Sequence, residues 1–158
     1  MKIRIIAEGK SKERYWKEAE QEYLKRLSRF AKIEVIEVAD ERTPENPSDR
    51  EKEMVLEKEA ARILPLLKGY GQIIALAEEG VEYDSLSFAG RLQRLEEAGQ
   101  GAVFLIGGSF GLAATLKKQA TEKISLSKMT FPHRLARITL LEQLFRAYKI
   151  NNNETYHK

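Results

Sequence analysis

The stretch Ala102-Val103-Phe104-Leu105-Ile106-Gly107-Gly108-Ser109-Phe110-Gly111 joins a continuous apolar run directly to a cluster of glycines. A short apolar run without alternating polar positions is typical of a strand that is buried on both faces of a parallel sheet. Glycines at its end allow positive φ angles and let backbone N–H groups approach a ligand closely. Because ligands of open α/β sheets bind at the carboxyl ends of the strands, this stretch predicts both a fold class and a candidate site.

On both sides of this stretch, short strand-like runs alternate with helix-like segments. Ser48 and Glu51 match a capping box, and residues 78–80 are expected to form an acidic turn. The alternation predicts a single α/β domain, residues 1–158, with a mostly parallel sheet. The expected strands are 2–8, 33–38, 72–77, 102–106 and 123–127, and the expected helices are 11–27, 48–67, 85–97, 112–120 and 132–150.

The composition excludes several kinds of chemistry. The 158 residues include no cysteine and only two histidines, His133 and His157, so disulfides, thiolate metal sites and cysteine nucleophiles are excluded. The N-terminal apolar run is too short for a signal peptide, and no segment approaches the roughly 20 apolar residues of a membrane span. We therefore expect a soluble, cytoplasmic protein without a metal and without a membrane partner.

Basic residues are concentrated toward the C-terminal end. The formal net charge of the chain is +3, whereas residues 117–158 hold 9 basic and 3 acidic residues together with both histidines. A one-sided basic region is expected for a protein whose partner carries phosphate, such as a nucleic acid. A solvated surface bias explains the same counts equally well.

The glycine cluster matches neither of the common nucleotide motifs. The P-loop spacing GxxxxGK[ST] is absent, and no GxGxxG follows the first expected strand. A plain tight turn therefore explains the cluster as well as a binding loop does.

The segment 125–133 connects the last expected strand to the last helix. It mixes apolar Leu126, Met129 and Phe131 with hydroxyl side chains, a combination that can enclose an aromatic base while polar groups bind its edge. An ordinary strand-to-helix connection, with Met and Phe in the core, is the alternative.

The last expected helix is apolar over more than one face. Such a helix is either buried in a core or shared between a core and a partner subunit. We expect a symmetric pair whose contact uses part of the apolar arc, from Leu140, Leu144, Ala147 and Tyr148. Arg137 lies within the arc. A guanidinium there needs either a structural carboxylate partner or a place in a site or interface.

The chain ends in Tyr156-His157-Lys158, which places an aromatic ring, an imidazole and an ammonium in its last three positions. A tyrosine can stack on a base, and the two cations can offset phosphate charge. Most C-termini are disordered, so a frayed tail is the alternative.

Taken together, these segments resemble the small bacterial SPOUT-class methyltransferases, which methylate N3 of a pseudouridine in large-subunit (23S) ribosomal RNA. The resemblance covers essentially the whole chain. The residues that carry it are Gly9, Lys10, Tyr15, Trp16, 36–38, 44–46, Leu76, 106–108, Gly111, 126–133, Glu142, Gln143 and 156–158.

The resemblance implies a C-terminal trefoil knot, a homodimer and action on assembled ribosomes, with S-adenosylmethionine as methyl donor. In the tail, Asn152, Asn153 and Thr155 stand where the family usually has an Arg-Gly pair and a proline.

The alternative functions are a related enzyme for another RNA nucleotide, a ribosome- or RNA-binding protein without catalysis, and a nicotinamide-dependent oxidoreductase. Carried over, the cofactor-binding residues are Leu76, Gly107, Gly108, Leu126, Ser127, Lys128, Met129, Thr130 and Phe131.

The expected catalytic residues follow from the chemistry that the resemblance implies. N3 of pseudouridine is protonated near neutral pH and must lose its proton to attack the methyl group. His157 is the expected acceptor, because an ordinary histidine pKa of about 6.5 suits this task. Arg137 and Lys158 are expected to hold phosphate or stabilise charge on the ring. Tyr156 is expected to orient the base and His133 to play a positioning role, with the tail completing the site of the opposite protomer.

Overall fold

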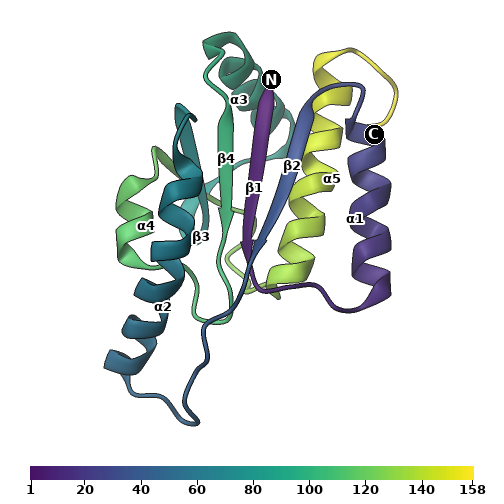
Figure 1. Cartoon of the computed structure of the whole chain (residues 1–158). Coiled ribbons are helices and arrows are strands. Elements are labelled where there is room, and N and C mark those ends of the chain that lie inside the picture. Colours follow the sequence, from purple (N-terminus) through teal and green to yellow (C-terminus); the bar gives the residue numbers. More distant parts are fainter.

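Five parallel strands form the middle layer of the structure, a computed structural model that describes residues 1–158 (Figure 1). Each pair of neighbouring strands is parallel, which confirms the predicted fold class. The apolar run of the sequence, strand β4, is buried at every position. In spatial order the strands are β2 (Lys32–Val38), β1 (Lys2–Glu8), β4 (Ala102–Ile106), β3 (Gln72–Glu82) and β5 (Glu122–Ser125).

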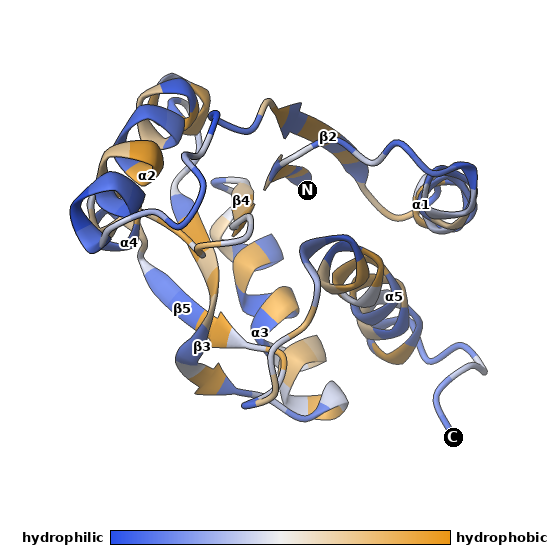
Figure 2. Cartoon of the chain, turned by 90° about the horizontal axis from the view of Figure 1, so that it is seen from below, coloured by the Kyte–Doolittle hydropathy of each residue, from blue (hydrophilic) through white to orange (hydrophobic).

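Helices cover both faces of the sheet, α2 and α4 on one side and α1 and α5 on the other (Figure 2). In β1, Ile3, Ile5 and Ala7 belong to the apolar cluster of the α1, α3 and α5 layer, whereas Ile6 belongs to the opposite cluster. Because side chains of a strand alternate between faces, Glu8 also points toward the α2 layer. The helices are α1 (Arg14–Leu27), α2 (Asp49–Ile63), a 3₁₀ segment (Leu64–Leu67), α3 (Ser85–Ala98), α4 (Ala114–Gln119) and α5 (His133–Asn151).

The expected acidic turn at residues 78–80 is wrong, because β3 continues through it to Glu82. The pairing of β3 with β5 shifts register between Leu76 and Val81, so the intervening residues form a bulge within the strand. A Cβ atom on Gly80 would lie 2.7 Å from the backbone of Ile124, which explains why glycine occupies the bulge. The capping box at the start of α2 is confirmed.

The expected contact between subunits through the apolar arc of α5 is also wrong. Leu140, Leu144, Ala147 and Tyr148 are all buried within the single chain. Helix α5 packs on the sheet and is flanked by α1 and α3, so neighbours within the chain use every part of the arc. A homodimer therefore has to use other residues.

No helix of the structure combines the length and the apolar character that crossing a membrane requires. The knot implied by the resemblance remains a prediction for the C-terminal part of the chain.

Candidate cofactor-binding site

A segment within β3 and the loops that follow its neighbours β4 and β5 surround a cleft of about 410 Å³ at the carboxyl end of the sheet, the lower end in Figure 1. These are the segments that the sequence singled out, at residues 76–79 in the bulged part of β3, 106–112 after β4 and 125–131 after β5. The volume lies within the range of small-molecule sites, about 300–1,000 Å³. Of the nine expected cofactor residues, the cleft is lined by Leu76, Gly107, Gly108, Leu126, Ser127, Met129, Thr130 and Phe131.

Lys128 is the one expected cofactor residue that does not line the cleft, and its side chain is exposed. A tight turn explains this placement. Ser125 Oγ donates to the Ser127 carbonyl (2.9 Å), and the Met129 amide donates to Ser127 Oγ (3.0 Å). The turn directs Lys128 to solvent beside the cleft.

The glycines after β4 are needed by the loop itself as well as by the cleft. A Cβ atom on Gly107 would lie 2.4 Å from the backbone carbon of Gly111. Gly111 has a φ of +80° and donates its amide to the Gly108 carbonyl at 3.0 Å. The sequence allowed either a tight turn or a binding loop here, and the same segment is both a tight turn and part of the cleft lining.

Two carboxylates at the rim of the cleft were missed, because residues 78–80 were interpreted as a turn. Glu78 accepts a hydrogen bond from the Thr130 hydroxyl at 2.6 Å, and Glu79 pairs with Lys117 at 2.8 Å. The hydrogen bond from Lys117 lowers the pKa of Glu79. Two acidic residues after a buried strand, at the same sheet edge as the glycines, were the signal that could have placed them.

His133 lines the cleft from the first turn of α5. Its Nε2 atom is buried without a hydrogen-bond partner. Burial lowers the pKa of His133, and the charges of Arg134 and Arg137 lower it further. The imidazole is therefore neutral at neutral pH.

Arg137 lies away from the cleft, in a buried ion pair. Only 1% of the residue is exposed, and its guanidinium contacts Glu37 at 2.8 Å and Glu20 at 3.1 Å and donates to the Gly9 carbonyl at 3.3 Å. These contacts join α5 to α1 and β2. The structure thus contradicts the expectation that Arg137 holds substrate phosphate, and supports the alternative of structural pairing.

The C-terminal tail is folded against its own α5. The Tyr156 hydroxyl donates to Glu142 at 2.9 Å, and the ring packs edge-on against Phe145 with 4.9 Å between centroids. Arg146 lies 3.1 Å from Nδ1 of His157. Because a guanidinium can only donate, Nδ1 accepts and the ring proton sits on Nε2. None of the three tail residues lines the cleft of its own chain, and His157 has no free acceptor in this position.

The basic C-terminal region is largely neutralised by ion pairs. Five of its nine cations contact carboxylates, namely Lys117, Arg134, Arg137, Arg146 and Lys149. The basic residues of this region that form no ion pair, and so remain available to an external partner, are Lys118, Lys123, Lys128 and Lys158. The structure contains no group of three or more His, Cys, Asp or Glu side chains that could hold a metal ion.

The sheet order and the cleft at its carboxyl end define an α/β domain with a ligand site built from loops. The sequence model described as "Predicted SPOUT methyltransferase" matches residues 1–157, and the chain belongs to this family. The ribosomal RNA large subunit methyltransferase H of Bacillus thuringiensis is 51% identical over 159 aligned positions, which cover 100% of both chains.

Two solved structures share the fold. A probable methyltransferase from Bordetella pertussis has a TM-score of 0.59 and 14% identity, covering 92% of this chain and 93% of its own. A methylase-family protein from Neisseria gonorrhoeae has a TM-score of 0.55 and 12% identity, covering 99% and 86%. At these identities the likeness concerns the fold alone.

Proposed function

We propose that this protein transfers a methyl group from S-adenosylmethionine to large-subunit ribosomal RNA, at N3 of a pseudouridine in the assembled ribosome. The observation that carries the proposal is the convergence of three segments, the bulge of β3 and the loops after β4 and β5, on one cleft. The name of the Bacillus thuringiensis relative, identical at 51% of positions over the full length, supports the same substrate class. A cytoplasmic location goes with such a substrate.

The residues of the cleft fit S-adenosylmethionine. Leu126, Phe131 and Leu76 offer apolar surface for the adenine ring, and Gly108 lets backbone amides approach a ligand. The carboxylate of Glu78 lies at the rim and has no cation partner, whereas Glu79 is paired with Lys117, so the negative charge of Glu78 favours a ligand with ammonium and sulfonium groups. When bound, the cofactor supplies a methyl group that its sulfonium has already activated.

The protein must then bind the RNA and remove the N3 proton. His157 is the proposed proton acceptor, and Tyr156 and Lys158 are proposed to hold the base and phosphate. In the folded-back position Nδ1 of His157 accepts from Arg146 and Nε2 carries the ring proton, so His157 serves this role only after the tail leaves its own α5. We propose that the tail then reaches the cleft of a second copy of the chain in a homodimer.

Deletion of residues 156–158 tests the role of the tail. We expect S-adenosylmethionine affinity to remain within about twofold, because no tail residue lines the cleft, while methyl transfer to ribosomes falls by at least a hundredfold, as expected for loss of a general base. Mixing this variant with a cleft-defective full-length chain restores activity if the tail acts across the dimer. Full activity of the deletion variant alone would show that the tail has no part in the reaction.

A matched glycine pair tests the cleft. Gly107→Ala forces the loop apart, because its Cβ would meet the Gly111 backbone at 2.4 Å, so titration calorimetry should detect no S-adenosylmethionine binding. Gly90→Ala is the control, because Gly90 lies in α3 outside the cleft and its Cβ would meet only the Arg94 side chain at 3.8 Å, an ordinary contact. Equal affinities of both variants and the parent would place the cofactor elsewhere.

The substrate is tested by mass spectrometry of ribosomal RNA from a strain that lacks the gene, with and without complementation. Loss and recovery of one methylpseudouridine support the proposal. Loss of a methyl group from another nucleotide identifies a related enzyme. An unchanged RNA, together with a protein that still binds ribosomes, indicates a binding protein without catalysis.

A further inference from the structure

Glu8, the last residue of β1, lies directly beneath the glycine loop of the cleft. It is 0% exposed, and its Oε2 accepts a hydrogen bond from the Gly108 amide at 3.0 Å. Its Oε1 is buried without any partner. Strands β1 and β4 are neighbours, so this hydrogen bond joins the ends of two adjacent strands at the edge of the sheet where the cleft opens.

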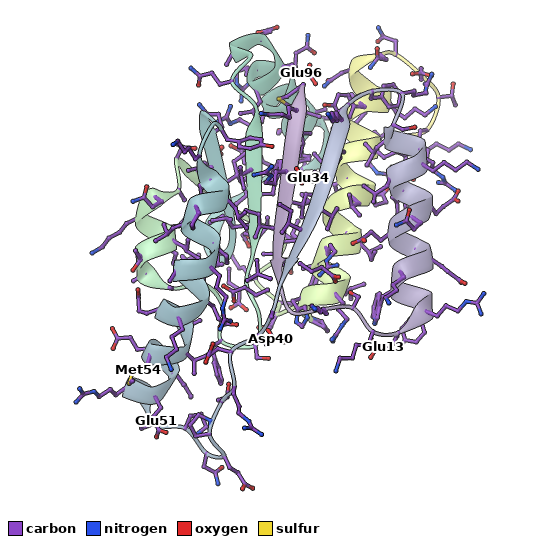
Figure 3. The ribbon with its side chains drawn as sticks, in the orientation of Figure 1. Glu13, Glu34, Asp40, Glu51, Met54 and Glu96 are labelled. Carbon is purple, nitrogen blue, oxygen red and sulfur yellow. The ribbon has the colours of Figure 1, made fainter.

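The charged groups around Glu8 come from three elements, and none of them is a cation paired with it. Asp40 lies after β2, at the lower end of the sheet in Figure 3, and an ideal Cβ on Gly108 would be 3.6 Å from it. Glu59 projects from α2 and is 5% exposed. From α5, His133 lies near Asp40, while Arg137 contacts Glu20 and Glu37 instead.

These surroundings make the ionised form of Glu8 costly. Burial raises the pKa of Glu8 to about 7, with further increases from Glu59 and Asp40, against the lowering effect of the Gly108 hydrogen bond. An apolar side chain at this position would pack against Ile6 and its neighbours without that cost. The carboxylate of Glu8 accepts one hydrogen bond, from the Gly108 amide of the loop, so any benefit of the carboxylate lies there.

We propose that Glu8 is a positioning residue of the cofactor site: its buried carboxylate holds the Gly108 amide and so sets the loop in the conformation that binds S-adenosylmethionine. The inference rests on the proposed function of the cleft. Glu8 does not line the cleft and acts through the loop rather than by touching the cofactor. A hydrogen bond to an ionised acceptor is stronger than one to a neutral acceptor, so the loop is held more firmly when Glu8 is charged.

The consequence is a pH-dependent cofactor affinity. As the pH falls through about 7, protonation of Glu8 replaces the charged acceptor with a neutral one. Affinity for S-adenosylmethionine then falls about fivefold to tenfold, the difference between charge-assisted and neutral hydrogen bonds. The pKa of His133 is lowered below 6.5 by burial, so its own titration lies at lower pH.

The test uses the full-length protein and the variants Glu8→Gln, Glu8→Val and Glu59→Gln. Glutamine keeps a neutral acceptor for Gly108, so Glu8→Gln should bind S-adenosylmethionine about fivefold more weakly than the parent at pH 8.5 and equally at pH 5.5. Glu8→Val removes the acceptor and should bind about tenfold more weakly at pH 8.5. Glu59→Gln keeps the parent's affinity at pH 8.5 and moves the midpoint to lower pH, because one repelling carboxylate is gone.

A second measurement needs no cofactor. The NMR shift of the Gly108 amide should titrate with a midpoint near pH 7 in the parent and stay flat in Glu8→Gln. Identical pH profiles of cofactor affinity in the parent and Glu8→Gln overturn the inference, whatever the amide shows. If the parent binds no S-adenosylmethionine at any pH, the proposed function fails together with the inference; if it binds and only the Glu8 effects are missing, the inference alone fails.

Discussion

Arg137 and Glu8 are both almost fully buried at the carboxyl end of the sheet, and their surroundings are opposite. Arg137 is 1% exposed and contacts two carboxylates, Glu20 and Glu37. Glu8 is 0% exposed, and its one hydrogen bond comes from a backbone amide, while the carboxylates of Asp40 and Glu59 lie nearby. A buried charge that is paired with an opposite charge has a structural role in the fold. A buried charge without such a partner costs free energy, and its burial shifts the pKa of the group.

The largest effect is expected where the pairing is broken. Arg137→Leu places an apolar side chain within the α5 arc but leaves Glu20 and Glu37 without their cation. The free energy of unfolding should therefore fall by about 3 kcal/mol. Urea unfolding at pH 7 measures this loss. Arg134→Leu is the control, because Arg134 is 29% exposed and lies 3.6 Å from its carboxylate partner, so its loss should stay below about 1 kcal/mol. Equal losses of unfolding free energy in the two variants would show that the buried ion pair of Arg137 stabilises the fold no more than the more exposed pair of Arg134.

The sequence predicted one member of this pair better than the other. The position of Arg137 within an apolar helical arc shows from spacing alone that it needs a partner, although not which one. Glu8 stands at the end of a strand, where an acidic residue is ordinarily exposed. Its burial depends on α2 and on the connection after β2, which no local pattern encodes. Glu59 is a similar case, since it directly follows Glu57 and Lys58 in a highly charged helix and is nevertheless only 5% exposed.

The three cleft segments could be predicted to lie together because each comes at the end of a short apolar run, and the carboxyl ends of parallel strands lie at one edge of the sheet. The burial of the whole apolar arc of α5 within one chain could not be predicted. Spacing shows how wide an apolar arc is, but not that α1 and α3 both pack against it. The bulge of β3 was missed for a related reason, because Gly80 is required by the backbone of Ile124 in another strand.

The opposite sign is expected at the unpaired charge. Because the pKa of Glu8 is raised from 4.5 to about 7, the unfolded chain loses this proton first, and stability falls as the pH rises between these values. Glu8→Gln removes this loss, so the variant should be more stable than the parent by about 2 kcal/mol at pH 8 and equally stable near pH 4. Thermal or urea unfolding across this range provides the measurement. If the stability curves of the parent and of Glu8→Gln run parallel over this pH range, burial does not destabilise the ionised carboxylate of Glu8, and the contrast with the paired Arg137 is lost.

The smallest effect, and the closest match to Glu8→Gln, is expected from the same substitution at Glu37. Burial raises the pKa of Glu37, but the hydrogen bond from the Ser11 amide and the contact with Arg137 outweigh it, so the pKa is lowered below 4.5. Its stabilising contribution is therefore present above pH 4.5 and is lost as the pH falls through the lowered value. Glu37→Gln should cost about 1 kcal/mol at pH 8, because Arg137 keeps Glu20 and a neutral acceptor in place of the lost charge. The stability curves of Glu37→Gln and Glu8→Gln should thus lie on opposite sides of the parent at pH 8 and approach it at acid pH, where both carboxyls are protonated. If both variants shift stability in the same direction at pH 8, then a cationic partner does not determine whether a carboxylate at this end of the sheet stabilises the fold.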